Sequence, residues 1–181
     1  MKMIGITGPQ ASGKGTVVDY LVEKRGFVHY SAREFLIEEI KRRGMPIDRD
    51  SMRIVADDLR STYHPAYIIE QLYLKARKSG KDSIIESIRA LGEVTLLKQQ
   101  PDFAFLAVDA DQGLRYERAI ARGNETDQVT FEKFQKQESL EADNEDPTRG
   151  NILACMKQAN RILDNNGTFA DLYQQIDDFI G

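Results

Sequence analysis

Residues 8–16 of this 181-residue chain read GPQASGKGT, and this stretch decides the fold. It follows a short apolar run at residues 2–7 and leads into residues 13–25, whose apolar side chains recur with helical spacing. A buried strand, a glycine-rich turn and a helix in this order form the first unit of an α/β arrangement. We therefore predict that the chain begins with these three elements.

The spacing of the glycines and the lysine in this stretch is that of a phosphate-binding P-loop. Glycines allow backbone N–H groups to point inward around phosphate oxygens, and the N-terminus of the following helix adds unpaired N–H groups and a partial positive charge. Lys14 would reach the terminal phosphates as a point charge. The residues expected to bind the phosphates of ATP are Gly8, Pro9, Gln10, Ala11, Ser12, Gly13, Lys14, Gly15 and Thr16.

A magnesium ion would accompany the nucleotide. Gly15 stands where a P-loop usually has the serine or threonine that binds Mg²⁺, so Thr16 is the candidate, directly or through a metal-bound water. Glu86 ends a later apolar run, and a carboxylate at the carboxyl end of such a strand faces the ligand crevice of an open α/β sheet. We therefore expect ATP and Mg²⁺ as cofactors, with Thr16 and Glu86 as metal ligands.

Apolar runs of strand length alternate with segments of helical spacing along the rest of the chain. This alternation predicts an α/β fold: a three-layer P-loop NTPase architecture with a central parallel sheet of about five strands and helices on both faces. The expected strands are residues 2–7, 27–30, 83–86, 103–108 and 161–164. The expected helices are residues 13–25, a segment capped by Ser31, and residues 50–60, 65–78, 92–99, 111–122, 130–142, 152–159 and 168–180.

The composition narrows the class of protein. Apolar residues make up 41% and charged residues 30%, as in an ordinary soluble domain, which argues against disorder, fibres and a disulfide scaffold. The net charge of -4 is not that of a general nucleic-acid-binding module. The lone Cys155 fits a reducing compartment, and no apolar window approaches the ~20 residues that span a bilayer. We expect a cytoplasmic protein with no membrane partner.

The loop ending GKGT at residues 13–16 resembles that of nucleoside monophosphate kinases of the adenylate kinase type. The similarity continues at residues 30–36, which resemble the start of the acceptor-binding helix, and at residues 84–89, which resemble the third strand and a phosphate-binding arginine. Residues 115–122 resemble the helix that leads into the lid, and residues 165–168 resemble the loop beside the adenine. The nearest resemblance is to archaeal adenylate-kinase-related, dephospho-CoA-kinase-like proteins.

This resemblance implies roles for segments and side chains. Residues 1–181 would form a single P-loop kinase domain, with an acceptor-binding helical insertion at residues 31–80 and a short lid at residues 122–150. Arg33 lies at a helix N-terminus, where its charge opposes the helix dipole and hints at an anionic partner. The implied catalytic residues are Lys14, Glu86, Arg118 and Arg122; the implied acceptor-binding residues are Arg33, Arg60 and Arg89; and Asn166 and Gly167 would lie beside the adenine.

Together these features predict a small kinase that transfers the γ-phosphoryl group of Mg-ATP to a nucleoside or deoxynucleoside monophosphate. A dephospho-CoA kinase or another metabolite kinase is the first alternative. An ATP-dependent switch or assembly factor is an alternative of another class, because Glu86 departs from the family's aspartate and a second lid arginine is not evident. Lys133, Lys136 or Arg149 would replace that arginine. The expected partner is a small phosphorylated acceptor, and the protein would be a monomer or a dimer.

Three further polar residues are expected to have structural roles. His29 and His64 are isolated in the sequence, without the spacing of metal ligands. Asp111 follows the fourth expected strand and is expected to cap the next helix.

Overall fold

The structure, a computed structural model, describes residues 1–123, 128–142 and 150–181 and contains a five-stranded parallel sheet in the order β2-β3-β1-β4-β5. The strands are β1 (Met3–Thr7), β2 (Val28–Ser31), β3 (Ser83–Glu86), β4 (Phe103–Asp109) and β5 (Arg161–Asp164). The helices are α1 (Lys14–Arg25), α2 (Ala32–Arg42), α3 (Arg49–Thr62), α4 (Tyr67–Ser79), α5 (Leu91–Lys98), α6 (Gln112–Ala121), α7 (Phe131–Ala142), α8 (Ile152–Lys157) and α9 (Phe169–Ile180). The predicted α/β fold class is confirmed.

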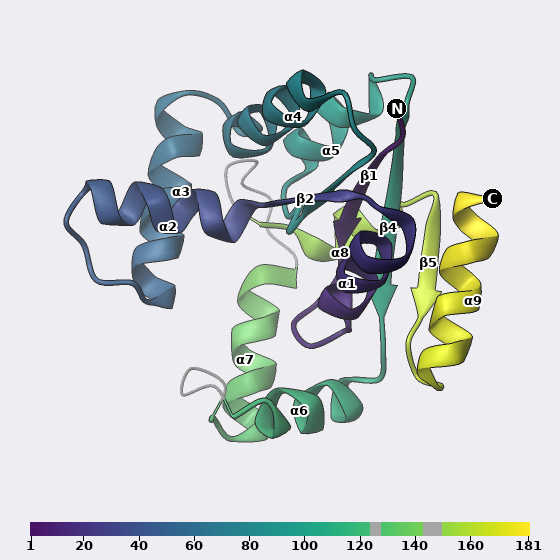
Figure 1. Ribbon diagram of the computed structural model, residues 1–181. Coiled ribbons are helices and arrows are strands. Elements are labelled where there is room, and N and C mark those ends of the chain that lie inside the picture. The colour runs from purple at the N-terminus through teal and green to yellow at the C-terminus, as the bar shows by residue number, and fades with distance from the viewer. Residues whose placement is uncertain (124–127, 143–149) are drawn as a thin grey trace.

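Helices cover both faces of the sheet because successive residues of each central strand point to opposite faces. On β3, Ile84 packs into a core with α1 and α9, whereas Ile85 packs into a second core with α4 and α5. On β4, Leu106 and Phe105 divide between the two cores in the same way. Figure 1 shows α1 and α9 on one side of the sheet and α4, α5 and α8 on the other. The strands are therefore short apolar runs rather than alternating ones.

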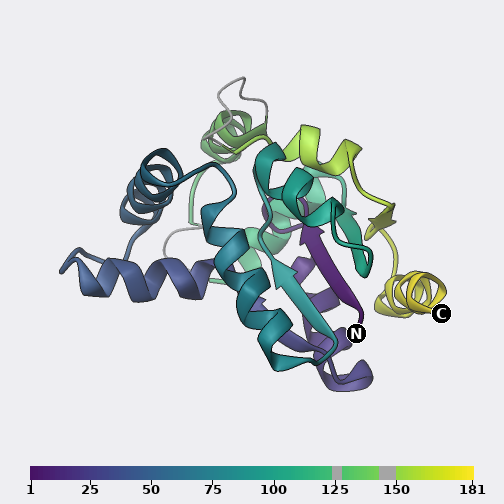
Figure 2. The same ribbon diagram turned by 90° about the horizontal axis from the view of Figure 1, so that it is seen from above.

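Three helices, α2, α3 and α4, connect β2 to β3, at the place of the predicted insertion. Seen from above, α2 and α3 project away from the sheet, while α4 lies along it (Figure 2). Ser31 caps α2 as predicted, because its side chain accepts a hydrogen bond from the backbone N–H of Glu34 at 3.3 Å. Arg43 at the end of α2 donates to Asp58 of α3 at 2.7 Å and ties the two projecting helices together.

Glu39 on α2 allows a test of this arrangement by pH. Hydrogen bonds from Arg42 and Arg43 lower its pKa from 4.5 to about 2. Because the folded-state pKa lies below that of the unfolded chain, the charged carboxylate stabilises the fold above about pH 4.5, and this contribution is lost as the pH falls towards 2. We expect Glu39→Gln to lower the free energy of unfolding by about 1 kcal/mol at pH 7, as measured by urea titration, and by a smaller amount near pH 2, where the carboxylate of the folded protein is partly protonated.

Glu38, exposed on the same helix, provides the matched control. Glu38→Gln should change the free energy of unfolding by less than about 0.5 kcal/mol at either pH. An equal loss of stability in Glu39→Gln at both pH values would contradict the assignment to the charged carboxylate.

The connection from β4 to β5 contains α6, α7 and α8. Asp111 caps α6 as predicted, since its side chain accepts hydrogen bonds from the backbone of Gly113 at 2.8 Å and of Leu114 at 3.3 Å. The predicted lid at residues 122–150 lies partly outside the described residues, and Arg149 lies entirely outside them. Across the three described ranges, no helix is both long enough and apolar enough to pass through a membrane.

Candidate active site

The turn after β1 has the backbone of a phosphate-binding loop. Gly8 has a φ of 144°, Ala11 a φ of 60° and Gly13 a φ of 103°, so the chain enters the left-handed region that favours glycine at both ends of the turn. Gly13 is the N-cap of α1 and makes no side-chain cap bond. The N–H groups of the first helical turn therefore have no capping side chain and point towards the loop.

The two terminal glycines of the loop are required by close packing. A Cβ atom on Gly8 would lie 2.2 Å from the backbone oxygen of Val108 in β4. A Cβ atom on Gly13 would lie 2.0 Å from Nδ2 of Asn165, which follows β5. Asn165 is buried and donates a hydrogen bond from Nδ2 to the backbone oxygen of Ser12 at 2.8 Å. Sequence reasoning missed this support, because it assigned the segment only to the adenine.

Lys14 spans the loop from the first turn of α1. Its Nζ donates to the backbone oxygens of Gly8 at 2.8 Å and Pro9 at 2.7 Å. Ser12 is fully buried, and its Oγ has no hydrogen-bond partner among the described residues. A loop with an ammonium group, an unpartnered buried hydroxyl and a helix N-terminus fits the phosphates of ATP.

Glu86 lies at the carboxyl end of β3, opposite Ser31 of β2 in the parallel register. Its Oε2 is 3.0 Å from Nε2 of His29. Burial acts to raise the pKa of Glu86, but the hydrogen bond with His29 and the positive charges of His29, Lys14 and Arg89 outweigh it, so the pKa lies below its usual value. The hydrogen bond to Glu86 raises the pKa of His29. The carboxylate of Glu86 is therefore charged at neutral pH.

The contact between His29 and Glu86 was not predicted from the sequence. His29 lies two residues before Ser31 on β2, so its side chain projects to the same face of the sheet as that of Ser31. Recognising the contact requires the knowledge that β2 pairs with β3, which the sequence does not give.

The predicted magnesium ligands lie on neighbouring elements. Thr16 is half-buried in the first turn of α1, and Glu86 ends β3. One hydroxyl and one carboxylate fit Mg²⁺, which usually binds through one or two protein oxygens together with phosphate oxygens and waters. In the part of the chain that the structure describes, no three His, Cys, Asp or Glu side chains gather into a metal-binding group of their own.

The predicted arginines have different environments. Arg118 donates to the backbone oxygen of Asn165 at 2.9 Å, and its Nη1 is buried without a hydrogen-bond partner among the described residues. Arg122 is exposed at the end of α6, and Arg33 is exposed in the first turn of α2. Arg89 is half-buried in the loop between β3 and α5.

Of the predicted adenine-loop residues, Asn166 accepts a hydrogen bond from the backbone of Asp111 at 2.7 Å, and Gly167 is exposed.

The environment of Arg60 argues against the predicted contact with an acceptor. Its side chain is 9% exposed, and its Nη2 is 2.9 Å from Oε1 of Glu93, which is itself fully buried. Charges this deeply buried are normally paired, and this pair is complete within the protein. Arg60 is therefore a buried structural cation rather than an acceptor-binding one.

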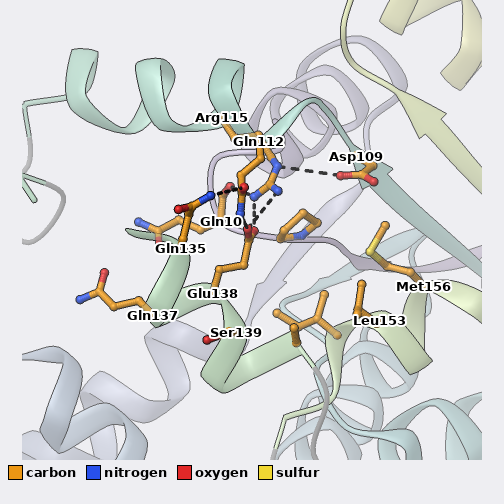
Figure 3. Close-up of a pocket in the computed structure, with 13 residues that line it drawn as sticks. Gln10, Asp109, Gln112, Arg115, Gln135, Gln137, Glu138, Ser139, Leu153 and Met156 are labelled. Atoms are coloured by element: carbon orange, nitrogen blue, oxygen red, sulfur yellow. Dashed lines mark hydrogen bonds and ion pairs between the residues drawn. The ribbon is translucent and has the colours of Figure 1, made fainter. Parts of the chain in front are cut away.

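A cavity of about 280 Å³ adjoins the loop at Pro9 and Gln10 (Figure 3). Arg115 of α6 lies at its edge, bound to the carboxylate of Glu138 of α7. Arg115 also donates to the backbone of Ala110 at 2.9 Å. Leu153 and Met156 of α8 line the opposite wall. The cavity thus has one polar and one apolar wall. Glu138 was not anticipated from the sequence.

A five-stranded parallel sheet with this loop between β1 and α1 defines a P-loop kinase-like protein. Residues 7–135 match the family AAA_17, described as an AAA domain, and the chain belongs to this family. It is 30% identical over 135 residues to a UPF0200 protein of Pyrobaculum aerophilum, and the aligned region covers 74% of each of the two chains.

Two solved structures share the fold. The first, TT1252 from Thermus thermophilus, has a TM-score of 0.63 and 23% identity over 99% of this chain and 96% of its own. The second, described as a sugar kinase from Janibacter sp. HTCC2649, has a TM-score of 0.57 and 16% identity over 99% of this chain and 94% of its own.

Proposed function

We propose that this protein is a phosphotransferase that moves the γ-phosphoryl group of ATP onto a small phosphorylated acceptor, a nucleoside or deoxynucleoside monophosphate. The observation that carries the proposal is the loop itself, with Lys14 bridging its backbone and Glu86 beside it at the end of β3. The positive charges of Lys14 and Arg89 both lower the pKa of Glu86, so a donor-binding and an acceptor-binding cation both act on this carboxylate. This supports a site in which the phosphate donor and the acceptor meet at the carboxyl ends of β1 and β3.

Catalysis would consist of positioning and charge stabilisation. The loop amides and Lys14 would hold the donor phosphates, and Thr16 and Glu86 would hold a magnesium ion that neutralises charge on the phosphate oxygens. Arg118 and Arg122 would cover the group in transfer, Arg33 and Arg89 would hold the acceptor phosphate, and Asn166 and Gly167 would lie beside the adenine. Residues 31–80 would carry the acceptor site, and residues 122–150 would act as the lid.

A metabolite whose reacting group is a hydroxyl is the second candidate acceptor. Two of the buried arginines, Arg60 and Arg115, are already paired with Glu93 and Glu138. The cavity beside Gln10 offers polar groups and an apolar wall rather than a cluster of unpaired cations. The fold is also shared with a protein described as a sugar kinase, although likeness of fold does not transfer a substrate.

One experiment separates these candidates. The protein is incubated with Mg-ATP and, in turn, each common ribo- and deoxynucleoside monophosphate, dephospho-CoA, D-gluconate, or no acceptor, and ADP formation is followed. A large increase in rate with one monophosphate supports the proposal, and an increase only with a hydroxyl acceptor supports the second candidate. A slow rate that is indifferent to every acceptor contradicts both and points to an ATP-dependent switch.

Arg89→Ala tests the acceptor side of the site. Alanine keeps the backbone N–H and carbonyl that Glu93 and Asn151 bind, so the fold should be retained. Loss of the guanidinium should raise the KM for the acceptor by about 10-fold or more, with the KM for ATP unchanged, because a charged hydrogen bond contributes about 1.5–3 kcal/mol. Steady-state kinetics with each substrate varied in turn measures both constants.

Arg77→Ala is the control for this variant, since Arg77 forms a half-exposed ion pair with Asp102. It should leave both KM values unchanged. An unchanged acceptor KM in Arg89→Ala would remove Arg89 from the site.

A further inference from the structure

Glu93 joins the helical insertion to the loop that carries Arg89. Its side chain is fully buried, and its two carboxylate oxygens bind different elements. Oε1 accepts hydrogen bonds from Nη2 of Arg60 on α3 at 2.9 Å and from its Nε at 3.2 Å. Oε2 accepts from the backbone N–H of Arg89 at 2.8 Å and of Ala90 at 3.0 Å. A single side chain therefore connects α3 with the segment that follows β3.

The loop between β3 and α5 is held from other directions through its backbone. Thr7, at the end of β1, donates from Oγ1 to the carbonyl of Ile88 at 2.7 Å. Asn151, which caps α8, donates its N–H to the carbonyl of Arg89 at 2.7 Å. Ser87 has a φ of 70°, a conformation that costs a non-glycine residue free energy and persists only where the surroundings fix it. The loop is thus constrained on both sides of Arg89.

The first turn of α5 also packs closely against the insertion. A Cβ atom on Gly92 would lie 3.1 Å from Cβ of Pro65, which precedes α4. Close packing at Gly92 and an ion pair at Glu93 therefore fix the same helical turn to the insertion. A buried ion pair gains little net stability, because desolvation offsets its attraction, but breaking it by removing one partner is strongly unfavourable. Such a pair is suited to holding a geometry rather than to adding stability.

We propose that Glu93 is a positioning residue for the acceptor. It holds the backbone of Arg89 in a fixed place relative to the helical insertion, and Arg60 acts on the acceptor site through Glu93 rather than by touching the acceptor. The proposal rests on the proposed function, because it takes Arg89 as the residue that binds the acceptor phosphate. It adds that the acceptor site is preformed by an ion pair that connects the insertion to the sheet.

The double variant Arg60→Met/Glu93→Met tests this proposal. Removing both charges leaves no unpaired buried charge, so the fold should be retained. The loop loses the carboxylate that binds two backbone N–H groups, and Arg89 is displaced. We expect the KM for the acceptor, the monophosphate that stimulates the wild type most, to rise about 10-fold or more with the KM for ATP unchanged, because small displacements at a site are costly. The single variant Arg60→Lys, with Glu93 intact, leaves the carboxylate charged and beside a cation, so its acceptor KM should stay within about twofold of that of the wild type.

Hydrogen–deuterium exchange provides a second measurement that needs no acceptor. Exchange at residues 87–90 should be faster in the double variant than in the wild type, at an unchanged unfolding midpoint. The control is Arg77→Met/Asp102→Asn, which removes an ion pair of the same 2.9 Å length away from this loop. If the double variant does not fold, Glu93→Asp replaces it, because the shorter carboxylate cannot span Arg60 and the loop.

The outcomes separate the two proposals. Unchanged exchange at residues 87–90, or equal increases in the two KM values, would overturn the role of Glu93 even if the protein is an active kinase. If no acceptor stimulates the wild type, the proposed function fails, and the exchange measurement still decides whether Glu93 holds the loop.

Discussion

Lys14→Ala should lower the rate of phosphoryl transfer by about 10²–10³-fold while the protein remains folded. The ammonium group of Lys14 donates hydrogen bonds to the backbone carbonyls of Gly8 and Pro9. Among the described residues, it is the only ammonium group that the loop backbone binds. In the reaction this charge would stabilise the terminal phosphates as negative charge develops on them, and a preorganised donor of this kind is worth about 3–4 kcal/mol. ADP formation with the best acceptor, at saturating ATP, measures the effect.

The fold should tolerate this change. Alanine is a favourable residue in the first turn of α1, and the loss of two hydrogen bonds at a half-buried site should cost about 1–2 kcal/mol. Lys24→Ala, on the exposed last turn of the same helix, is the matched control and should keep the wild-type rate. Full activity in Lys14→Ala would show that Lys14 takes no part in the reaction. Thermal unfolding of the same variant checks that a lower rate comes from the missing ammonium group and not from loss of the fold.

The parts of the site that the sequence predicted are local in the chain. The loop at residues 8–16, the cap at Asp111 and the strand that ends at Glu86 each depend on residue types within a few positions. Their physical causes are backbone freedom at glycine, capping of N–H groups, and burial of a short apolar run. Each of these causes depends on residue types that are close together in the chain, so a single sequence is enough to recognise them.

The parts that it did not predict join distant segments. Asn165 supports the loop through Ser12, 153 residues earlier, and Arg60 pairs with Glu93, 33 residues later. Whether an arginine on an amphipathic helix faces a ligand or a buried carboxylate depends on how α5 packs against α3, and helical spacing does not contain that information. The sequence therefore predicted that Arg60 binds the acceptor, whereas in the structure Arg60 pairs with Glu93.

Gly8→Ala should cause the largest loss of stability of any single alanine substitution in the loop. Its φ of 144° is a conformation that alanine rarely adopts, and the new Cβ would lie 2.2 Å from the backbone oxygen of Val108. Because that oxygen belongs to the backbone of β4, which is held between β1 and β5 in the sheet, it cannot move aside as a side chain would. We expect a loss of about 3 kcal/mol or more, a melting temperature lower by roughly 10 °C, and no measurable nucleotide binding.

Gly15→Ala makes the same chemical change two residues beyond Gly13, the last left-handed glycine of the loop, and the opposite result is expected. A Cβ atom on Gly15 would meet no atom within 4 Å, and the residue is helical. Alanine should therefore leave the melting temperature unchanged or raise it slightly, since it is the better helix former by about 1 kcal/mol. Thermal unfolding of both variants, with ATP binding by calorimetry, makes the comparison. An unchanged melting temperature in Gly8→Ala would show that the loop can accommodate a Cβ atom beside Val108. The close packing of Gly8 would then not be what holds the loop in its phosphate-binding conformation.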